Sequence, residues 1–238
     1  MILLLLHGVG GNGRLWDDVA SSSPLRSLAP DLAGHGAAPP LARYTFADYR
    51  EELLGRIADE VGSQPVVILG HSMGGALGLT IAAEPGPLDI RGVVGIGIKA
   101  RWAPEEKALL HRVADKGIAW FDAEAQACER YVKLSGLAGV LEPDAPGARA
   151  GVREEAGRWR FATDPEVYRV EPGPLGPPIA AAACPIVLAA GENDAMSPSE
   201  SLEGLGAPVF TLAGAGHNAH VEQPDAALRL LDELGIAL

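Results

Sequence analysis

The sequence predicts an α/β fold in which helices flank a mostly parallel sheet. Three observations lead to this prediction: short apolar runs alternate with helical patterns, turn residues follow each run, and the alternation stops over one long internal stretch. Strands that alternate with helices form parallel sheets covered on both faces. The chain has 238 residues, 47% of them hydrophobic, which is enough for one large α/β domain with an insertion.

The first hundred residues alternate regularly between the two kinds of element. In order, we expect a strand at 2–6, a helix at 14–20, a strand at 27–30, a helix at 46–61, a strand at 65–69, a helix at 73–83 and a strand at 91–98. Thr45 and Asp48 have the spacing of a capping box at the start of the second helix, whose apolar residues recur at helical intervals.

The alternation stops between residues 100 and 183 and then resumes. Inside that stretch we expect helices at 104–116, 122–134 and 146–159, a weaker piece at 165–170 and a Pro- and Gly-rich exit at 171–178. Strands at 185–190 and 208–212 and a closing helix at 224–234 follow. We therefore expect residues 1–99 and 184–238 to form the core, and residues 100–183 to form a helical cap insertion over the sheet.

The formal net charge of −12 comes from 19 basic and 31 acidic side chains. An acidic surface repels phosphate backbones and anionic lipid, which argues against nucleic acid or a membrane as the partner. We expect a small-molecule substrate instead. The Ala- and Gly-rich composition, with Arg far more frequent than Lys, indicates a GC-rich bacterial genome.

The apolar opening at residues 2–6 is too short for a signal peptide and lacks its basic region and cleavage pattern. No stretch approaches the roughly 18 to 20 apolar residues of a membrane helix. These observations predict a cytoplasmic location. Cys128 and Cys184 match no metal or redox spacing, so we expect two buried thiols, and nothing in the sequence implies a metal ion or an organic cofactor.

A G-x-S-x-G sequence at residues 70–74 lies directly after one expected strand and directly before a helix. This strand–turn–helix context is typical of a nucleophile elbow. Its glycines permit a tight turn and a close approach of backbone, and the helix N-terminus behind it stabilises negative charge. Ser72 is therefore the candidate nucleophile. The alternative interpretation is a Gly-rich helix start without chemistry.

Five short sequences resemble, in order, the signatures of the α/β-hydrolase superfamily. They are His7-Gly8-Val9-Gly10-Gly11, Asp31-Leu32-Ala33-Gly34-His35-Gly36, Gly70-His71-Ser72-Met73-Gly74-Gly75, Gly191-Glu192-Asn193-Asp194 and Gly216-His217. They span nearly the whole chain, and the insertion lies where that family carries its cap domain. The resemblance implies an enzyme with a serine nucleophile, a histidine base and an acid partner.

The resemblance also implies which residues complete this triad with Ser72. The acid of the family usually follows the strand expected here at 185–190, which points to Asp194, with Glu192 as the nearest competitor. The base directly follows a glycine after the last strand, which points to His217. His220, three residues later, is the alternative base and is otherwise expected to support or pack against the site.

The oxyanion hole of the family is formed by backbone N–H groups, and the matching positions here are Val9 and Met73. The remaining polar residues of the signatures are expected to be structural: His7 and His71 to hydrogen-bond loop backbone, and Asp31 and His35 to shape a turn beside the pocket. His111, in the insertion, is expected at the surface.

One departure from the family pattern affects the fold. Family members commonly have two further strands before the His-Gly turn, whereas His7 follows only six residues here. We therefore expect a sheet of about six strands that lacks the first two edge strands. The missing strands would lie far from the triad, so their absence concerns the stability of the sheet edge and not catalysis.

Substrate recognition is expected from the insertion and its borders. Trp102, Trp120 and Trp159 predict an apolar or aromatic pocket, although packing inside the insertion explains them equally well. Lys99 ends a strand at the carboxyl edge of the sheet, where ligands bind in such folds. It either pairs with a substrate carboxylate or is a solvated lysine.

Ester cleavage makes the least demand beyond a triad and an oxyanion hole, so a small-molecule carboxylic ester is the leading substrate class. Lactones and thioesters are close variants of it. A carbon–carbon bond hydrolase, a proline-releasing aminopeptidase and a hydroxynitrile lyase use the same triad and remain alternatives. A ligand-binding sensor without turnover is the alternative from outside the enzymes.

Overall fold

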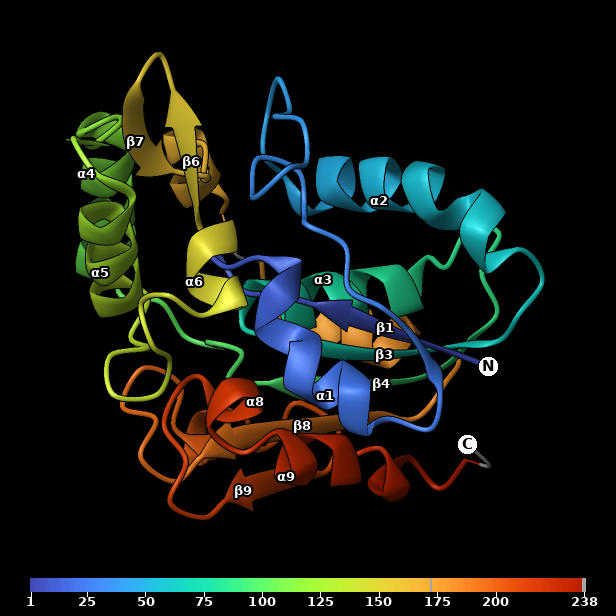
Figure 1. The fold of residues 1–238 in the computed structure, drawn as a ribbon. Coiled ribbons are helices and arrows are strands. Elements are labelled where there is room, and N and C mark those ends of the chain that lie inside the picture. The colour runs from blue at the N-terminus through green and yellow to red at the C-terminus, as the bar shows by residue number, and fades with distance from the viewer. Residues whose placement is uncertain (172, 237–238) are drawn as a thin grey trace.

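Six parallel strands form the main sheet in the computed structural model, which describes residues 1–171 and 173–236 (Figure 1). They are β1 (Ile2–Leu6), β2 (Arg26–Leu28), β3 (Val66–His71), β4 (Ile90–Ile96), β8 (Ile186–Gly191) and β9 (Val209–Leu212). Their order is β2-β1-β3-β4-β8-β9, and every neighbouring pair is parallel. The prediction of a mostly parallel sheet of about six strands is confirmed.

Helices cover both faces of this sheet (Figure 1). One face carries α2 (Phe46–Val61), α3 (Met73–Ala83) and α7 (Gly176–Ala181), and the other carries α1 (Asp17–Ser22), α8 (Ala219–Glu222) and α9 (Pro224–Arg229). Helix α2 begins where the sequence predicts. The Thr45 hydroxyl accepts a hydrogen bond from the Asp48 backbone N–H (3.1 Å) and so satisfies one of the free donors of the first turn.

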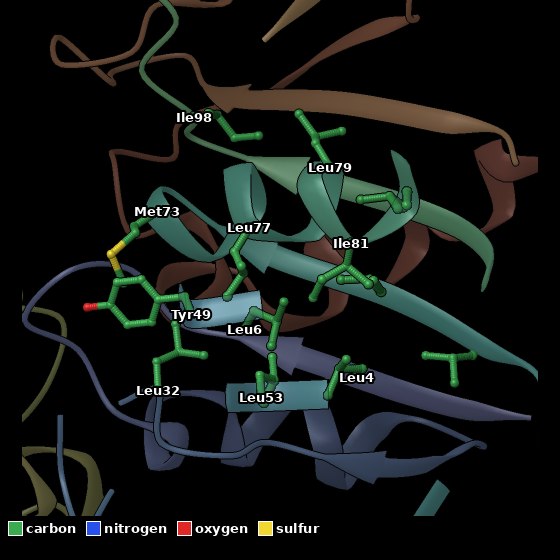
Figure 2. Close-up of a cluster of buried hydrophobic side chains, with 14 of the residues drawn as sticks. Leu4, Leu6, Leu32, Tyr49, Leu53, Met73, Leu77, Leu79, Ile81 and Ile98 are labelled. Atoms are coloured by element: carbon green, nitrogen blue, oxygen red, sulfur yellow. The ribbon is translucent and has the colours of Figure 1, made fainter. Parts of the chain in front are cut away.

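The central strands are buried on both faces, as their continuous apolar sequences predict. Every residue of β1 is buried, and successive side chains point to opposite faces. Leu3 and Leu5 join the core beneath α1 and α9, whereas Leu4 and Leu6 join the core beneath α2 and α3. Figure 2 shows Leu53 of α2 beside these last two side chains. Burial stabilises the fold by about 1.5–3 kcal/mol for each such leucine.

The insertion contains α4 (Pro104–Asp115) and α5 (Glu124–Leu134), close to the predicted helices. The predicted helix at 146–159 is wrong. It ends after one turn, α6 (Pro146–Ala150), and a hairpin of β6 (Val152–Glu155) and β7 (Arg158–Phe161) follows. Ala156 and Gly157 both have positive φ (52° and 78°), which is the requirement of a two-residue hairpin turn.

A third short strand, β5 (Trp120–Phe121), pairs with β7 and completes an antiparallel sheet in the order β5-β7-β6. Side chains of this sheet pack with α5 around Cys128 and Tyr131 in a separate hydrophobic cluster. Leu15 of the core belongs to the same cluster, and the Tyr44 hydroxyl donates a hydrogen bond to Asp164 (2.6 Å) across the same boundary. The insertion is therefore packed on the core rather than separate from it.

Several shorter elements differ from their predicted ranges. The helix expected at 14–20 is a 3₁₀ turn, η1 (Gly13–Trp16), followed by α1, and the closing helix is α9 followed by η4 (Asp232–Leu234). The weaker piece at 165–170 is the 3₁₀ helix η2 (Pro165–Arg169), and η3 (Ser199–Ser201) was not anticipated. Cys128 is a buried thiol as expected, whereas Cys184 is only partly buried.

Within residues 1–171 and 173–236, the longest helices fall short of the length and apolar character that crossing a bilayer requires.

Candidate active site

Ser72 lies in the sharp turn between β3 and α3, with φ 51° and ψ −118°. A non-glycine residue at positive φ is strained, at a cost of about 1–3 kcal/mol. The turn needs its glycines: a Cβ at Gly74 would collide with the Leu6 carbonyl oxygen, and one at Gly70 would lie 2.6 Å from the Gly74 carbonyl oxygen. The Ser72 N–H donates to the Ile96 carbonyl (2.8 Å), which fixes the serine at the carboxyl end of the central strands.

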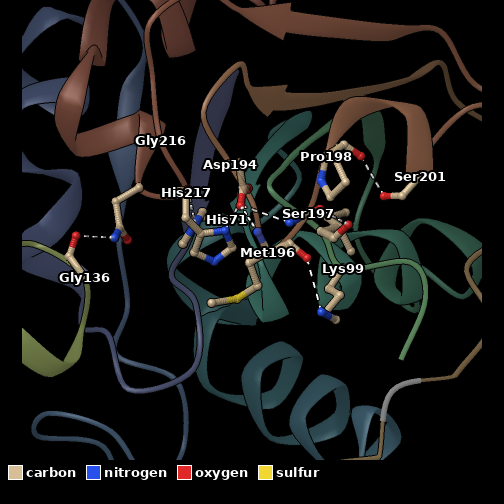
Figure 3. Close-up of polar contacts among 12 residues, drawn as sticks. His71, Lys99, Gly136, Asp194, Met196, Ser197, Pro198, Ser201, Gly216 and His217 are labelled. Atoms are coloured by element: carbon tan, nitrogen blue, oxygen red, sulfur yellow. Dashed lines mark hydrogen bonds and ion pairs between the residues drawn. The ribbon is translucent and has the colours of Figure 1, made fainter. Parts of the chain in front are cut away.

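Asp194 and His217 form a hydrogen-bonded pair beside this turn (Figure 3). Oδ2 of Asp194 accepts from Nδ1 of His217 at 2.8 Å, and Oδ1 accepts from the backbone N–H groups of Met196 and Ser197, both at 2.9 Å. Burial alone would raise the pKa of Asp194, but the hydrogen bonds to His217 and to the two N–H groups outweigh burial and lower it. Asp194 is therefore an ionised carboxylate with its side chain fully buried.

Ser72 and His217 line one large cavity of about 1050 Å³. Their side chains are not hydrogen bonded to each other in the part of the chain that the structure describes. Gly97, at the end of β4, lets the Asp–His pair approach the sheet. It has φ 62°, and a Cβ there would lie 3.4 Å from both Asp194 Oδ2 and His217 Cε1.

Val9 and Met73, whose backbone N–H groups are the candidate oxyanion donors, line the same cavity as Ser72. Among the described residues neither of them donates a hydrogen bond, so both donors are free. The turn that carries Val9 is packed tightly against the nucleophile turn, because a Cβ at Gly8 would lie 3.2 Å from the Ser72 Cβ. The Gly10 N–H donates to Nε2 of His35 (3.0 Å), which fixes the same turn from the other side.

His7 and His35 are structural, as the sequence predicts. In each ring Nδ1 donates to a neighbouring carbonyl, of Gly8 (2.8 Å) or Ala33 (3.1 Å), while Nε2 accepts a backbone N–H. Burial lowers the pKa of His7 to about 4 and that of His35 to about 3, so both rings are neutral. Asp31 also shapes the turn, because its carboxylate accepts the N–H groups of two other residues.

His71 connects the nucleophile turn to the base. Its Nε2 donates to the His217 carbonyl (2.9 Å), and burial lowers its pKa well below the usual value, so the ring is neutral. His220 stacks on His71 with ring centroids 4.3 Å apart and packs against Trp16 on the other side. Both ring nitrogens of His220 are buried without a partner among the described residues, and burial lowers its pKa to about 3.

Glu192 and His220, the alternative acid and base, are placed differently from Asp194 and His217. Glu192 is exposed and its Oε2 accepts the Gly214 N–H (2.8 Å), while His220 lies outside the cavity lining. His111 lies half-exposed on α4, beside Glu171.

Lys99 and Trp102, two of the residues expected near the substrate, line the cavity. The Lys99 ammonium is paired with Glu106 of α4 at 2.6 Å. It donates a second hydrogen bond, to the Met196 carbonyl at 3.3 Å, which Figure 3 shows. It also lies 5.3 Å from the centre of the Trp102 ring, a cation–π distance. Lys99 is therefore neutralised by the protein itself.

Trp120 and Trp159, the other two residues expected near the substrate, are absent from the lining of this cavity. Trp120 is 36% exposed in β5 with the Arg158 guanidinium over its ring, and Trp159 packs against the hydrophobic cluster of the insertion. The tryptophans of the insertion predicted apolar surface there, but the sequence could not say which of these side chains would face the cavity. Both residues belong to the antiparallel sheet of the insertion, in which Trp120 pairs with Arg160 and Trp159 with Phe121.

Three residues that shape the site were not predicted from the sequence. Ser197 donates its N–H to Asp194 and its hydroxyl to the Ile98 carbonyl (2.6 Å), and no sequence pattern signals this. Tyr168 of η2 lines the cavity above Gly10. Gly97 could have been found, because a glycine that ends an apolar strand often marks a close approach of another group. No group of three or more His, Cys, Asp or Glu in residues 1–171 and 173–236 is arranged to hold a metal ion.

A six-stranded parallel sheet with a serine elbow on its central strand, and an Asp–His pair on the loops beside it, defines the class of α/β-hydrolases. The alpha/beta hydrolase family model matches residues 3–230, and the chain belongs to this family. The prediction of an enzyme of this class is confirmed.

Relatives of the chain include a 2-succinyl-6-hydroxy-2,4-cyclohexadiene-1-carboxylate synthase from Serratia proteamaculans, 26% identical over 94% of this chain and 89% of that protein. Lipase LipV from Mycobacterium tuberculosis is 42% identical over 34% of this chain, a match that spans only 31% of the lipase. Among solved structures, E-2-(acetamidomethylene)succinate hydrolase has a TM-score of 0.82 at 23% identity, covering 99% of this chain and 91% of that one. The esterase Rv0045c from M. tuberculosis has a TM-score of 0.75 at 21% identity, covering 98% and 83%.

The buried histidines predict that stability falls with pH below about 6.5. In the unfolded chain these four rings titrate near 6.5, whereas burial lowers the pKa of each in the folded protein. Below pH 6.5 the unfolded chain therefore binds protons that the folded chain does not, and the free energy of unfolding decreases by about 1 kcal/mol per pH unit for each ring. Urea unfolding at pH 7, 6 and 5 measures this slope.

His220→Phe is the matched control, because this ring donates and accepts no hydrogen bond among the described residues. In this variant, the number of protons taken up on unfolding between pH 6.5 and 5 should be lower by close to one. Equal stability of the wild type at pH 7 and pH 5 would contradict the account of neutral buried rings.

Proposed function

We propose that the protein is a serine hydrolase that cleaves small-molecule carboxylic esters through a Ser72–His217–Asp194 triad and an acyl-enzyme intermediate. The observation that carries this proposal is the convergence of a strained serine and an Asp-bound histidine on one cavity. Asp194 fixes the imidazole by its Nδ1–H, which leaves Nε2 as the proton acceptor. Lactones and thioesters present the same acyl carbon and belong to the same proposal.

In the first step, Ser72 Oγ attacks the carbonyl carbon while its proton passes to Nε2 of His217. The new O–C bond forms as the carbonyl electron pair moves to oxygen, and the N–H groups of Val9 and Met73 stabilise that oxyanion. The ester C–O bond then breaks, and the imidazolium returns the proton to the leaving alkoxide. The product is an alcohol and an acyl group on Ser72.

Water completes the cycle by the same route. His217 takes a proton from the water as the hydroxide attacks the acyl carbon, and then gives the proton to Ser72 Oγ as the carboxylic acid departs. The ionised Asp194 stabilises the imidazolium in both halves of the reaction. His71 positions the base through its hydrogen bond to the His217 carbonyl.

The insertion contributes to substrate selection in this proposal. Residues 100–183 act as a cap over the core, because α4 and η2 supply walls of the cavity that contains Ser72. Trp102 and Lys99 lie where the cap joins the core and would contact the substrate near its entry. Trp120 and Trp159 would support the cap without contact to the substrate.

The first prediction concerns Ser72. A fluorophosphonate probe should form one adduct, on the peptide that contains Ser72, and Ser72→Ala should lose at least about 10³-fold in kcat for p-nitrophenyl esters, since the nucleophile is removed. Mass spectrometry locates the adduct. An adduct on another residue, or normal turnover by Ser72→Ala, contradicts the proposal.

The second prediction separates Asp194 from Glu192. In Asp194→Asn, the N–H groups of Met196 and Ser197 keep the amide oxygen on their side, so the NH₂ group faces His217. The ring then presents its unprotonated Nδ1 to that amide and a proton on Nε2, where it cannot accept from Ser72. The equivalent change in the serine-protease template costs on the order of 10⁴ in kcat, and we expect at least about 10² here.

Glu192→Gln is the matched control, because it removes a charge from the same turn while its amide oxygen still accepts the Gly214 N–H. Its kcat should stay within a few-fold of wild type, because an exposed carboxylate contributes only a screened charge. Both variants should give wild-type circular dichroism. An inactive Glu192→Gln with an active Asp194→Asn would move the acid role to Glu192.

A further inference from the structure

The cavity continues well beyond Ser72 along one face of α3. Met73, Ala76, Thr80 and Ala83 line it, at spacings of three and four residues that place them in a row on one side of the helix. The opposite side of α3 is packed on the sheet at Gly78, where a Cβ would lie 3.0 Å from Ile68 of β3. The row ends at the exposed Glu84, so the groove opens to solvent at its far end.

Helix α7 forms the other wall of this groove. Pro177, Pro178 and Ala181 line the cavity, and α7 packs against α3. The Thr80 hydroxyl donates to the Ala76 carbonyl (3.0 Å), so its hydrogen-bond donor is already satisfied within the helix. The groove, defined as the space between the α3 row and α7, is therefore apolar from Ser72 almost to its exit.

Other apolar side chains gather around the same cavity. Five of the seven large hydrophobic residues exposed in the described chain line it: Leu109, Val113, Ile118, Leu134 and Met196. Of the basic residues in the lining, Lys99 is paired with Glu106, and Lys116 and Arg130 are exposed in the insertion. Among the described residues, the cavity lining therefore presents no buried, unpaired cation to a substrate carboxylate, and its apolar surface suits a hydrocarbon chain.

The chemistry of the proposed reaction decides which part of the substrate enters the groove. His217 must reach the leaving oxygen to protonate it, so the leaving group lies on the side of the cavity that continues to Asn218 and Leu134. The acyl chain then points to the other side of Ser72, along α3. We infer that the protein prefers esters of long, uncharged acyl chains, which bind in the groove between α3 and α7. This inference rests on the proposed function.

The length of the groove sets the length of the acyl chain that it can bind. From Met73 to Ala83 the helix advances ten residues, or about 15 Å at 1.5 Å per residue. An extended chain advances about 1.2 Å per bond, as the 3.6 Å per three-bond residue of an extended peptide shows. The groove therefore accommodates about twelve carbons, and a longer chain extends past Glu84 into water.

The test uses p-nitrophenyl esters from acetate to hexadecanoate, below their micelle-forming concentrations. For the wild type, kcat/KM should rise about two- to fourfold per methylene, the gain from burying each one, and level off near twelve carbons. Ala76→Phe should end the rise near four carbons, because the ring fills the groove about 4.5 Å from Met73. Ala83→Phe should end it only near twelve, and Ala125→Phe, at an exposed α5 position outside the cavity, should leave the whole profile unchanged.

Binding of 2-alkanones of six to sixteen carbons to Ser72→Ala, measured by calorimetry, separates the groove from the reaction. The dissociation constant should fall with chain length in Ser72→Ala and stop falling beyond about four carbons past the carbonyl when Ala76→Phe is added. Length-dependent binding without turnover of any ester by the wild type supports the groove and overturns the proposed function. Turnover without length dependence, or identical profiles for Ala76→Phe and Ala125→Phe, overturns the groove.

Discussion

The close packing of the nucleophile turn against β1 is the constraint on which the rest of the site depends. Gly74 leaves room only for hydrogen where α3 meets the Leu6 carbonyl, and Gly70 meets Gly74 itself at the other side of the turn. The backbone at Ser72 is held at positive φ between these contacts. The resulting strain of about 1–3 kcal/mol is small beside the burial of β1 and β3, each of which contributes several fully buried aliphatic side chains.

Burial around the nucleophile turn also determines the charge state of its histidines. His7, His35, His71 and His220 surround the nucleophile turn, and desolvation keeps all four neutral. A neutral ring at His71 donates to the His217 carbonyl without placing a positive charge beside the base. The one buried carboxylate in contact with His217 is Asp194 among the described residues, so an imidazolium formed at His217 has a single, fixed counter-charge.

The fold and the nucleophile turn could be predicted because each depends on local sequence, whereas Asp194 and His217 were assigned through the resemblance to a known family. Continuous apolar runs predict buried strands, and a G-x-S-x-G turn after such a run has few other uses. The hairpin at 152–161 was missed because the stretch from Pro146 has enough Ala and Arg to suggest a helix, whereas Ala156-Gly157 decides the structure through its backbone conformation. Trp120 and Trp159 lie in the sheet that this hairpin forms with β5, so their place outside the cavity lining could not be anticipated without the hairpin.

The position of the groove has a consequence for how substrate preference changes in this fold. One wall is α3, whose N-terminus must stay at Ser72 and whose side chains Leu77, Leu79 and Ile81 are buried in the core. Length of the bound chain is therefore set by a helix that cannot shift without moving the nucleophile. The facing wall, α7, is a short helix whose Ile179 is buried in the core, whereas its Pro177, Pro178 and Ala181 line the cavity. Substitutions at these three positions change the groove without replacing a residue of the core. In this arrangement chain length depends on the core, while the width and shape of the bound chain depend on the insertion.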